Sequence, residues 1–169
     1  MEKRTVIDKK RLLVRHARAD DCEDIWKWRN TPVGRQFSFS QEEIPLPDHR
    51  IWFDKKIKDE SSVIYILENS QKVKVGQARF QIMPDNTASI SVNMNPQYIG
   101  RGLGVSVITE ATRTLFNEKP KLISVQAEVL IDNIASKKVF QRAGYSRLGQ
   151  YVKQGKEALL FVIENKNYK

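Results

Sequence analysis

The segment NPQYIGRGLGV, residues 95–105, has the composition of an anion-binding loop. Its glycines at positions 100, 102 and 104 allow positive φ and let a ligand approach the backbone closely. The N–H groups that they expose lead into a predicted helix, whose unpaired amides and positive dipole end attract anions such as a diphosphate. A glycine-rich turn without a ligand would show the same pattern. The segment is not a Walker loop, since no Gly-Lys-Ser/Thr follows, and a dinucleotide fingerprint should follow the first strand instead.

The surrounding pattern predicts the elements that hold this loop. Asp20 and Glu23 have the spacing of a capping box, and Gly144 stands where a left-handed helix end is expected. A loop is predicted over residues 33–46. Strands are predicted over residues 11–17, 62–68, 73–81, 88–94, 122–129, 145–152 and 156–163, and helices over residues 20–30, 47–58, 103–119 and 133–143. This order indicates a mixed α/β domain in which a strand–helix–strand crossover joins an antiparallel meander.

Length and composition indicate one globular domain over residues 1–169, of which residues 1–10 are polar and expected to be flexible. The single cysteine, Cys22, excludes an internal disulfide and a cysteine-rich metal site, and no metal is predicted. The 29 Lys and Arg against 20 Asp and Glu give a net charge of +9, which favours an anionic partner.

The same composition argues against two classes of partner. No run of five or six basic residues marks a nucleic-acid tail, so nucleic acid is disfavoured. No apolar run reaches the roughly 18 residues that a membrane span needs. The first residues lack the apolar segment of a secretory signal, and a cytoplasmic location is therefore expected.

Residues 95–105 resemble motif A of the GNAT superfamily of acetyl-CoA-dependent N-acetyltransferases, in which Arg/Gln-x-x-Gly-x-Gly/Ala holds the coenzyme pyrophosphate. Two registers fit. One is Gln97-x-x-Gly100-x-Gly102; the other begins at Ile99, agrees better with the helix start, and puts Ile where Arg is common. We prefer the second, since backbone amides provide most of the phosphate contacts. The resemblance implies acetyl-CoA as co-substrate, with contacts from Met94, Ile99, Gly100, Arg101, Gly102, Leu103, Gly104, Val105, Asn133 and Ser136.

A second part of the resemblance lies downstream of this loop. Asn133-Ile-Ala-Ser136, followed by Phe140 and Gly144-Tyr145, resembles the family's Asn-x-x-Ser/Ala…Gly-Phe/Tyr helix, which flanks the pantetheine arm. The order of predicted elements also agrees with the family along nearly the whole chain. The resemblance therefore implies the GNAT fold, an α/β domain with a mixed, mostly antiparallel central sheet flanked by four helices.

The resemblance also implies a base for direct acetyl transfer to a primary amine. Glu128 lies on a predicted strand, five residues before Asn133. In the ribosomal-protein branch of the family, the strand Glu at this spacing deprotonates the amine, directly or through one water. The alternative is a Glu on the exposed face of a strand, which is the commoner place for this residue type.

The acid that protonates the leaving thiolate is less defined. Phe140 stands where many family members have a Tyr for this role. The role is therefore open among Ser136, Tyr98, Tyr145 and water, and Ser136 joins Glu128 in the predicted catalytic set. A backbone N–H near the end of the fourth strand, around Met94, would polarise the thioester carbonyl.

The substrate is expected at the first two helices. Trp28-Arg29-Asn30 and His49-x-x-Trp52-Phe53 resemble a GNAT subgroup of nucleotide-linked amino-sugar N-acetyltransferases, including those of the pseudaminic acid pathway. Aromatic rings can stack on a base or sugar, and Arg and His can contact phosphate. The substrate-binding candidates are therefore Arg29, Asn30, His49 and Trp52. A core position for Trp52 and a surface helix start for His49 are the alternatives.

The predicted activity is an acyltransferase acting on a nucleotide-linked 4-amino sugar, in bacterial surface-glycan biosynthesis. One alternative is a ribosomal-protein, peptide N-terminal or other small-amine acetyltransferase, such as a polyamine-type enzyme. A third is a non-catalytic or nucleic-acid-binding module. The late strands are a candidate homodimer interface.

Overall fold

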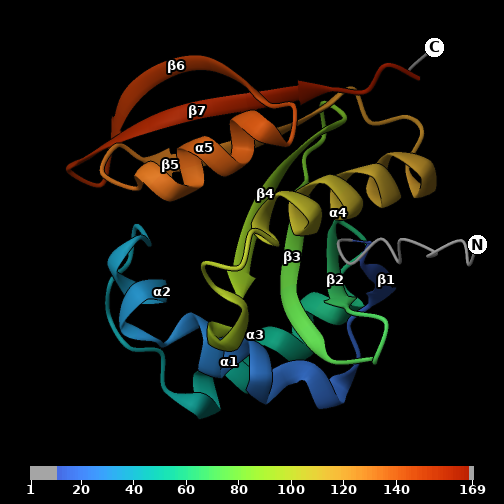
Figure 1. Cartoon of the computed structure of the whole chain (residues 1–169), viewed down its shortest axis with the longest axis vertical. Helices are drawn as coiled ribbons and strands as arrows, with labels where there is room; N and C mark the ends of the chain where they lie inside the picture. Colours follow the sequence, from blue (N-terminus) through green and yellow to red (C-terminus); the bar gives the residue numbers. More distant parts are fainter. Residues whose placement is uncertain (1–10, 168–169) are drawn as a thin grey trace, which may run out of the picture.

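The computed structural model describes residues 11–167 and contains a seven-stranded sheet with the order β1-β2-β3-β4-β5-β7-β6 (Figure 1). Neighbouring strands are antiparallel except β4 and β5, which are parallel. The strands are β1 (Leu13–His16), β2 (Ser62–Glu68), β3 (Lys74–Ile82), β4 (Thr87–Met94), β5 (Ser124–Leu130), β6 (Ser146–Lys153) and β7 (Lys156–Glu164). The helices are α1 (Cys22–Arg29), α2 (Pro32–Gln36), α3 (Leu46–Lys58), α4 (Gly104–Glu118) and α5 (Ile134–Arg142). This confirms the predicted mixed, mostly antiparallel sheet.

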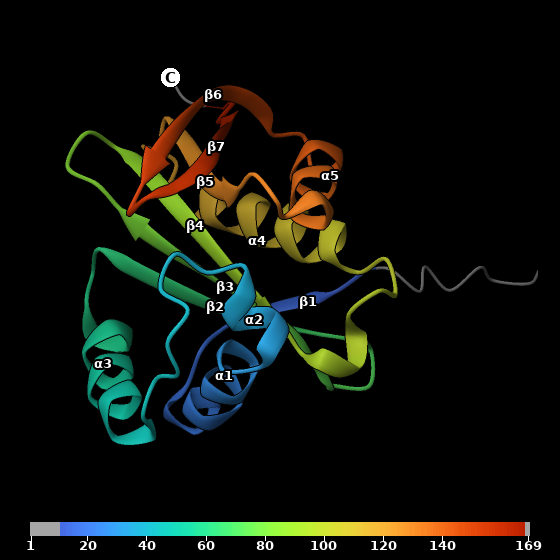
Figure 2. The same ribbon diagram turned by 90° about the vertical axis from the view of Figure 1, so that its left-hand side faces the viewer.

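Helices cover both faces of the sheet (Figures 1 and 2). The amphipathic α4 packs Val107, Ala111 and Leu115 against the larger core, together with Phe140 of α5. On the opposite face, α1 and α3 enclose a smaller core around Ile25, Phe53, Ile64 and Ile66. Residues of β2 alternate between the two cores, with Val63, Tyr65 and Leu67 in the larger one and Ile64 and Ile66 in the smaller one.

The parallel strands β4 and β5 separate along their length and leave an opening in the sheet between them. They pair only at Thr87–Ser124, Ala88–Val125 and Ser89–Gln126. Beyond these pairs the two strands diverge, and β4 stays with β3 whereas β5 stays with β7 (Figure 1). Because α4 follows β4 and α5 follows β5, the N-termini of both helices lie at the open end.

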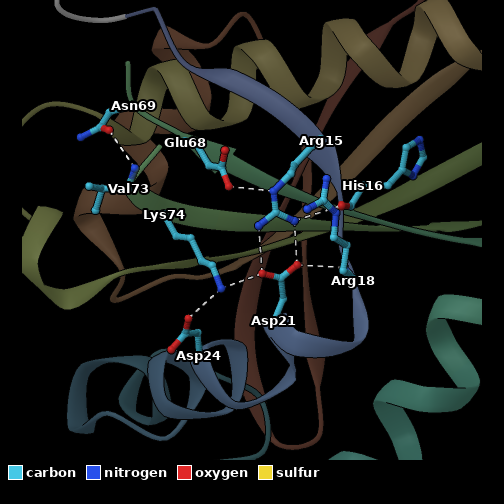
Figure 3. Close-up of polar contacts among 9 residues, drawn as sticks. All are labelled: Arg15, His16, Arg18, Asp21, Asp24, Glu68, Asn69, Val73 and Lys74. Atoms are coloured by element: carbon cyan, nitrogen blue, oxygen red, sulfur yellow. Dashed lines mark hydrogen bonds and ion pairs between the residues drawn. The ribbon is translucent and has the colours of Figure 1, made fainter. Parts of the chain in front are cut away.

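A buried ion cluster fixes the start of α1 to β1, β2 and β3 (Figure 3). The Asp21 carboxylate is fully buried and accepts a forked pair of hydrogen bonds from Arg15, at 2.7 and 3.0 Å. Lys74 of β3 lies 2.8 Å from the same carboxylate, and the Arg18 N–H donates to it at 2.8 Å. Arg15 also bonds Glu68 of β2, at 2.7 Å. One carboxylate thus joins β1, the start of α1 and β3.

Two local predictions at the N-terminal half are wrong. A short helix, α2, lies within the predicted loop 33–46, because Thr31 accepts the Gly34 N–H and Pro32 occupies the first helical position. The sheet is therefore flanked by five α-helices rather than four. The predicted Asp20–Glu23 capping box is absent: α1 has no side-chain cap, and Asp21 instead accepts the Arg18 N–H in the 3-10 turn, Ala19–Asp21, that precedes α1. The expectation for residues 1–10 lies outside the described residues.

Candidate functional site

The loop between β4 and α4 is tied to β3 at its start. The Asn95 N–H donates to the Val75 carbonyl at 2.9 Å, and its side-chain amide donates to the Lys74 carbonyl at 2.8 Å. A single 3-10 turn follows, and the Tyr98 hydroxyl accepts a 3.3 Å hydrogen bond from Asn69. The Arg101 guanidinium lies 5.5 Å from the Tyr98 ring centroid. The loop is thus anchored at one end and exposes its glycine-rich half.

The glycines of this loop are required by backbone conformation. Gly100 and Gly102 have φ of 76° and 73°, a region that other residues rarely adopt. A Cβ at either position would meet no heavy atom within 4 Å, so the space beside this backbone is open. Gly104 differs, since its Cβ would lie 3.3 Å from a methyl group of Val139 on α5. Its small size lets the start of α4 pack against α5.

The N-terminus of α4 has no side-chain cap. Leu103 at the N-cap position makes no capping hydrogen bond, and the first turn contains no acidic residue. The first-turn N–H groups of a helix have no partner within it, which here leaves those of Gly104, Val105 and Ser106 free to bind an anion. At α5, in contrast, the Asn133 side chain accepts the Ser136 N–H at 3.1 Å. The uncapped α4 and the open glycine loop fit a diphosphate, which is the group that this segment was predicted to bind.

The backbone of β4 also points a donor into the opening between β4 and β5. Because the Asn95 N–H bonds to Val75 of β3 and N–H directions alternate along a strand, the Met94 N–H points away from β3. Within the described residues no strand pairs with this edge of β4 beyond Ser89. The position predicted to polarise a carbonyl therefore lies on an unpaired strand edge.

Across the opening, Glu128 lies on β5 with its carboxylate held by two side chains. Lys153 Nζ is 2.8 Å from a carboxylate oxygen, and the Tyr151 hydroxyl donates to the same oxygen. Burial opposes ionisation of Glu128, but Lys153 and Tyr151 outweigh this effect and lower the pKa of the carboxyl below its ordinary value. Burial and the neighbouring carboxylate raise the pKa of Tyr151, so its phenol is protonated at neutral pH. Glu128 is consequently an ionised proton acceptor.

The candidates for a proton donor separate clearly by burial. Phe140 is in the core, with its ring 5.1 Å from that of Tyr145. Tyr145 is also buried, and its hydroxyl lies 2.8 Å from that of Thr112. Neither side chain is free to meet a ligand, which removes Tyr145 from the alternatives left open for the acid. Ser136 is half-buried in the first turn of α5, beside the open end of the sheet.

Arg29 and Asn30 hold the segment between α2 and α3. Asn30 exchanges two hydrogen bonds with the Ile44 backbone, at 2.8 and 2.9 Å, and Arg29 Nη2 donates to the Ser40 carbonyl at 2.7 Å. Arg29 Nη1 is buried without a hydrogen-bond partner among the described residues. From the other side, Lys156 at the β6–β7 turn donates to the Phe39 carbonyl at 2.8 Å. The segment thus spans from α1 to the β6–β7 hairpin.

His49 occupies a position that differs from its predicted role. It is 3% exposed, and its Nε2 lies 3.0 Å from the Cys22 carbonyl. Burial lowers the pKa of His49, although the hydrogen bond to Cys22 opposes this shift, so the ring is neutral and joins α3 to α1. Contact between His49 and a substrate phosphate is therefore contradicted by the packing. Trp52 is half-buried on α3, and the Arg79 guanidinium lies 5.2 Å from its ring centroid.

Three side chains of this region were missed from the sequence: Tyr151, Lys153 and Arg79. Alternation along β6 could have placed Tyr151 and Lys153 on one face of their strand. Their approach to Glu128 depends on the register across β7, including an irregularity between Arg147 and Gly149 that no turn signal marks.

Residues 11–167 contain no group of three or more His, Cys, Asp or Glu side chains that could hold a metal ion. None of the helices in this part of the chain has the length and apolar character to cross a bilayer.

Comparison with known proteins identifies one matching family and one curated relative. The acetyltransferase (GNAT) domain family matches residues 11–146. An uncharacterised protein of Methanocaldococcus jannaschii is 23% identical over 149 residues, which is 87% of the present chain. The present chain spans 30% of the length of that relative.

Similar folds occur among solved structures. Spermidine N-acetyltransferase from Vibrio cholerae, solved with CoA and spermine, superposes with a TM-score of 0.82 and 17% identity, covering 94% of this chain and 98% of that one. An aminoglycoside acetyltransferase in complex with coenzyme A gives a TM-score of 0.79 and 18% identity, with coverage of 93% and 96%. At these identities the likeness shows a shared fold.

Proposed function

Because the chain belongs to the acetyltransferase (GNAT) domain family, we propose that it transfers the acetyl group of acetyl-CoA directly to a primary amine. The observation that carries the proposal is the divergence of β4 and β5. It brings an uncapped helix N-terminus, an unpaired strand edge and an ionised carboxylate to one opening. Each of these features matches one requirement of acyl transfer: anion binding, carbonyl polarisation and proton removal.

The coenzyme diphosphate would lie on the loop of residues 99–105. The free amides at the start of α4 donate to it, and Gly100 and Gly102 give the loop the conformation that presents their own N–H groups. Arg101, which is exposed, adds a positive charge at the same place. The fit explains why Ile99 can stand where Arg is common, since the backbone provides the contacts.

Acetyl-CoA supplies the acetyl group: the amine nitrogen bonds to the acetyl carbon as the carbon–sulfur bond breaks. The Met94 N–H donates to the acetyl oxygen and stabilises the charge that develops there. Glu128 accepts the proton that the ammonium must lose, directly or through a water. The nitrogen loses its second proton as the carbon–sulfur bond breaks, and the Ser136 hydroxyl, at the first turn of α5, relays a proton to the departing sulfur: it gives its own proton and regains one from the nitrogen.

The acceptor amine would enter beside the residue 37–41 segment, which contacts the β6–β7 hairpin through Lys156 and places the Phe39 ring against Lys153, the partner of Glu128. We propose a nucleotide-linked amino sugar as its class, supported by the sequence resemblance at Arg29 and Trp52. The burial of His49 weakens this support. A peptide N-terminus or a small polyamine-like amine is the second candidate, in line with the spermine complex of the Vibrio cholerae neighbour.

The first test is thermal unfolding with and without acetyl-CoA. A ligand that binds only the native state raises the midpoint, by several degrees at concentrations far above its dissociation constant. A rise with acetyl-CoA followed by thiol release in the presence of an amine supports the proposal. No rise at saturating acetyl-CoA contradicts it, and a steep loss of affinity for nucleic acid with salt would then favour a nucleic-acid-binding module.

A further inference from the structure

Arg79 and Glu128 lie in one row across the same face of the sheet. Arg79 of β3 pairs directly with Ser91 of β4, and Ser91 is two residues beyond Ser89, the last β4 residue that pairs with β5. Glu128 is likewise two residues beyond the partner of Ser89 on β5. Direct partners share a face, so Arg79, Ser91 and Glu128 face the same side and the opening separates the last two.

Arg79 carries a charge that the described protein does not neutralise. No carboxylate of residues 11–167 lies within ion-pair distance of it; β3 and β4 contain no acidic residue. The guanidinium is partly buried, and burial lowers its pKa without an opposing acidic neighbour. Arginine remains protonated in proteins, so a half-buried positive charge lacks its counter-ion.

The guanidinium is also positioned toward the opening. Its Nη2 lies 3.4 Å from the Ser91 hydroxyl, on the β4 side, while the Trp52 ring of α3 packs against it with 5.2 Å to the ring centroid. The aromatic ring limits the rotamers of the side chain and stabilises its charge. The Arg79 guanidinium is therefore held beside the Ser91 hydroxyl, with N–H donors available for a ligand.

From this geometry we propose that Arg79, with Ser91, binds an anionic group, a phosphate or a carboxylate, on the acceptor whose amine meets Glu128. The inference rests on the proposed acetyl transfer and specifies its substrate: an amine that carries an oxyanion. Paired strands are about 4.8 Å apart and β4 and β5 have diverged at this level, so the amine and the anion are separated by more than about 10 Å. Arginine binds both oxyanions through paired N–H donors.

The same charges disfavour a polycationic acceptor. Glu128 faces the opening, and Lys153 already neutralises it at 2.8 Å. With Glu128 neutralised by Lys153, Arg79 leaves a net positive charge on this face of the sheet beside the opening. A polyamine would meet repulsion here, whereas an anionic amine would meet attraction.

The experiment measures binding of glucosamine 6-phosphate, muramic acid and glucosamine by calorimetry to protein already saturated with CoA. These probes share an amino sugar and differ in carrying a phosphate, a carboxylate or no anion. The variants are Arg79→Gln, Arg79→Lys and, as a control with the same loss of charge, Arg113→Gln. Arg113 lies on the exposed side of α4 and pairs there with Glu110.

The expected result is tighter binding of an anionic probe than of glucosamine, a loss of about tenfold or more in Arg79→Gln, and a partial return in Arg79→Lys. Arg113→Gln should bind as wild type. Which anionic probe loses affinity distinguishes phosphate from carboxylate. Equal binding by wild type and Arg79→Gln, or no preference for either anion, overturns the proposal while CoA binding leaves the acetyltransferase function standing. Failure to bind CoA would contradict that function instead.

Discussion

Glu128 on β5 and Lys153 on β6 form an ion pair across β7, with 2.8 Å between Nζ and the carboxylate oxygen. The pair joins the strand that borders the opening to the terminal hairpin. It keeps the carboxylate ionised and fixes its direction, but it also makes Glu128 a weaker base than an unpaired Glu. The strength of the base and its placement are therefore set by the same contact.

Glu128→Gln should lower kcat by at least about a hundredfold, because the amide cannot accept the ammonium proton. The substitution keeps the shape of the side chain, and Glu128 lies apart from the glycine loop. The dissociation constant of acetyl-CoA should therefore stay within about twofold of wild type. Single-turnover kinetics and calorimetry on the same preparation measure both quantities, and an unchanged kcat would remove Glu128 from the base role.

Lys153→Met should move the acidic limb of the pH–rate profile to higher pH. Lys153 favours the charged form of Glu128, so its removal raises the pKa of the carboxyl, and the base becomes protonated at a pH where it was ionised before. Activity should therefore fall earlier as pH decreases, and the profile of kcat/KM between pH 4 and 8 reports the shift. An acidic limb that stays in place would show that another group titrates there.

Gly102→Asp should abolish coenzyme binding at ordinary concentrations. It adds a carboxylate beside the amides proposed to bind the diphosphate, at a residue with φ of 73°. Gly155→Asp is a matched control, since Gly155 also has φ of 73° and open space around its Cβ but lies in the β6–β7 turn. Calorimetry with CoA should show loss of affinity only in the first variant. Equal affinities would place the diphosphate elsewhere.

Sequence patterns predicted most elements because the side chains that each strand or helix buries in a core are apolar and recur with the period of that element. The strand over residues 62–68, for example, matches β2 residue for residue. The short α2 was missed because its signal is only Thr31 and Pro32, within a segment rich in turn-forming residues. The segment after α2 is held by hydrogen bonds from Arg29 to Ser40 and from Lys156 to Phe39, which no local pattern encodes.

The candidate site was predictable only where it is local in sequence. The glycine loop and the α5 cap at Asn133 depend on residues a few positions apart, and the structure places both at the open end. Tyr151, Lys153 and Arg79 reach the site through strand order and register, over separations that single-sequence patterns do not define. His49 shows the converse: it belongs to the segment that resembles the amino-sugar subgroup, yet it is buried and joins α3 to α1.

Asp21→Asn should lower the free energy of unfolding and make it less dependent on pH in the acid range. Burial would raise the pKa of Asp21, but hydrogen bonds from Arg15 and Lys74 outweigh this and lower it to about 2, against an ordinary 3.8. Because the folded pKa is the lower one, the contribution is complete above about pH 4 and is lost as pH falls toward 2. The shift corresponds to about 2.5 kcal/mol at neutral pH.

Removing the shared carboxylate costs on the order of 3 kcal/mol, somewhat more than this linkage alone, because Arg15 and Lys74 lose their buried counter-charge and keep only Glu68 and Asp24, respectively. Chemical denaturation at pH 7 should show that loss, and the difference between Asp21→Asn and wild type should shrink between pH 4 and 2. Asp20→Asn, at the exposed neighbouring residue, is the control and should unfold as wild type at every pH. A constant difference across the acid range would show that Asp21 acts through packing rather than charge. Since the Lys74 carbonyl also holds Asn95, the Asp21 variant should in addition weaken CoA binding.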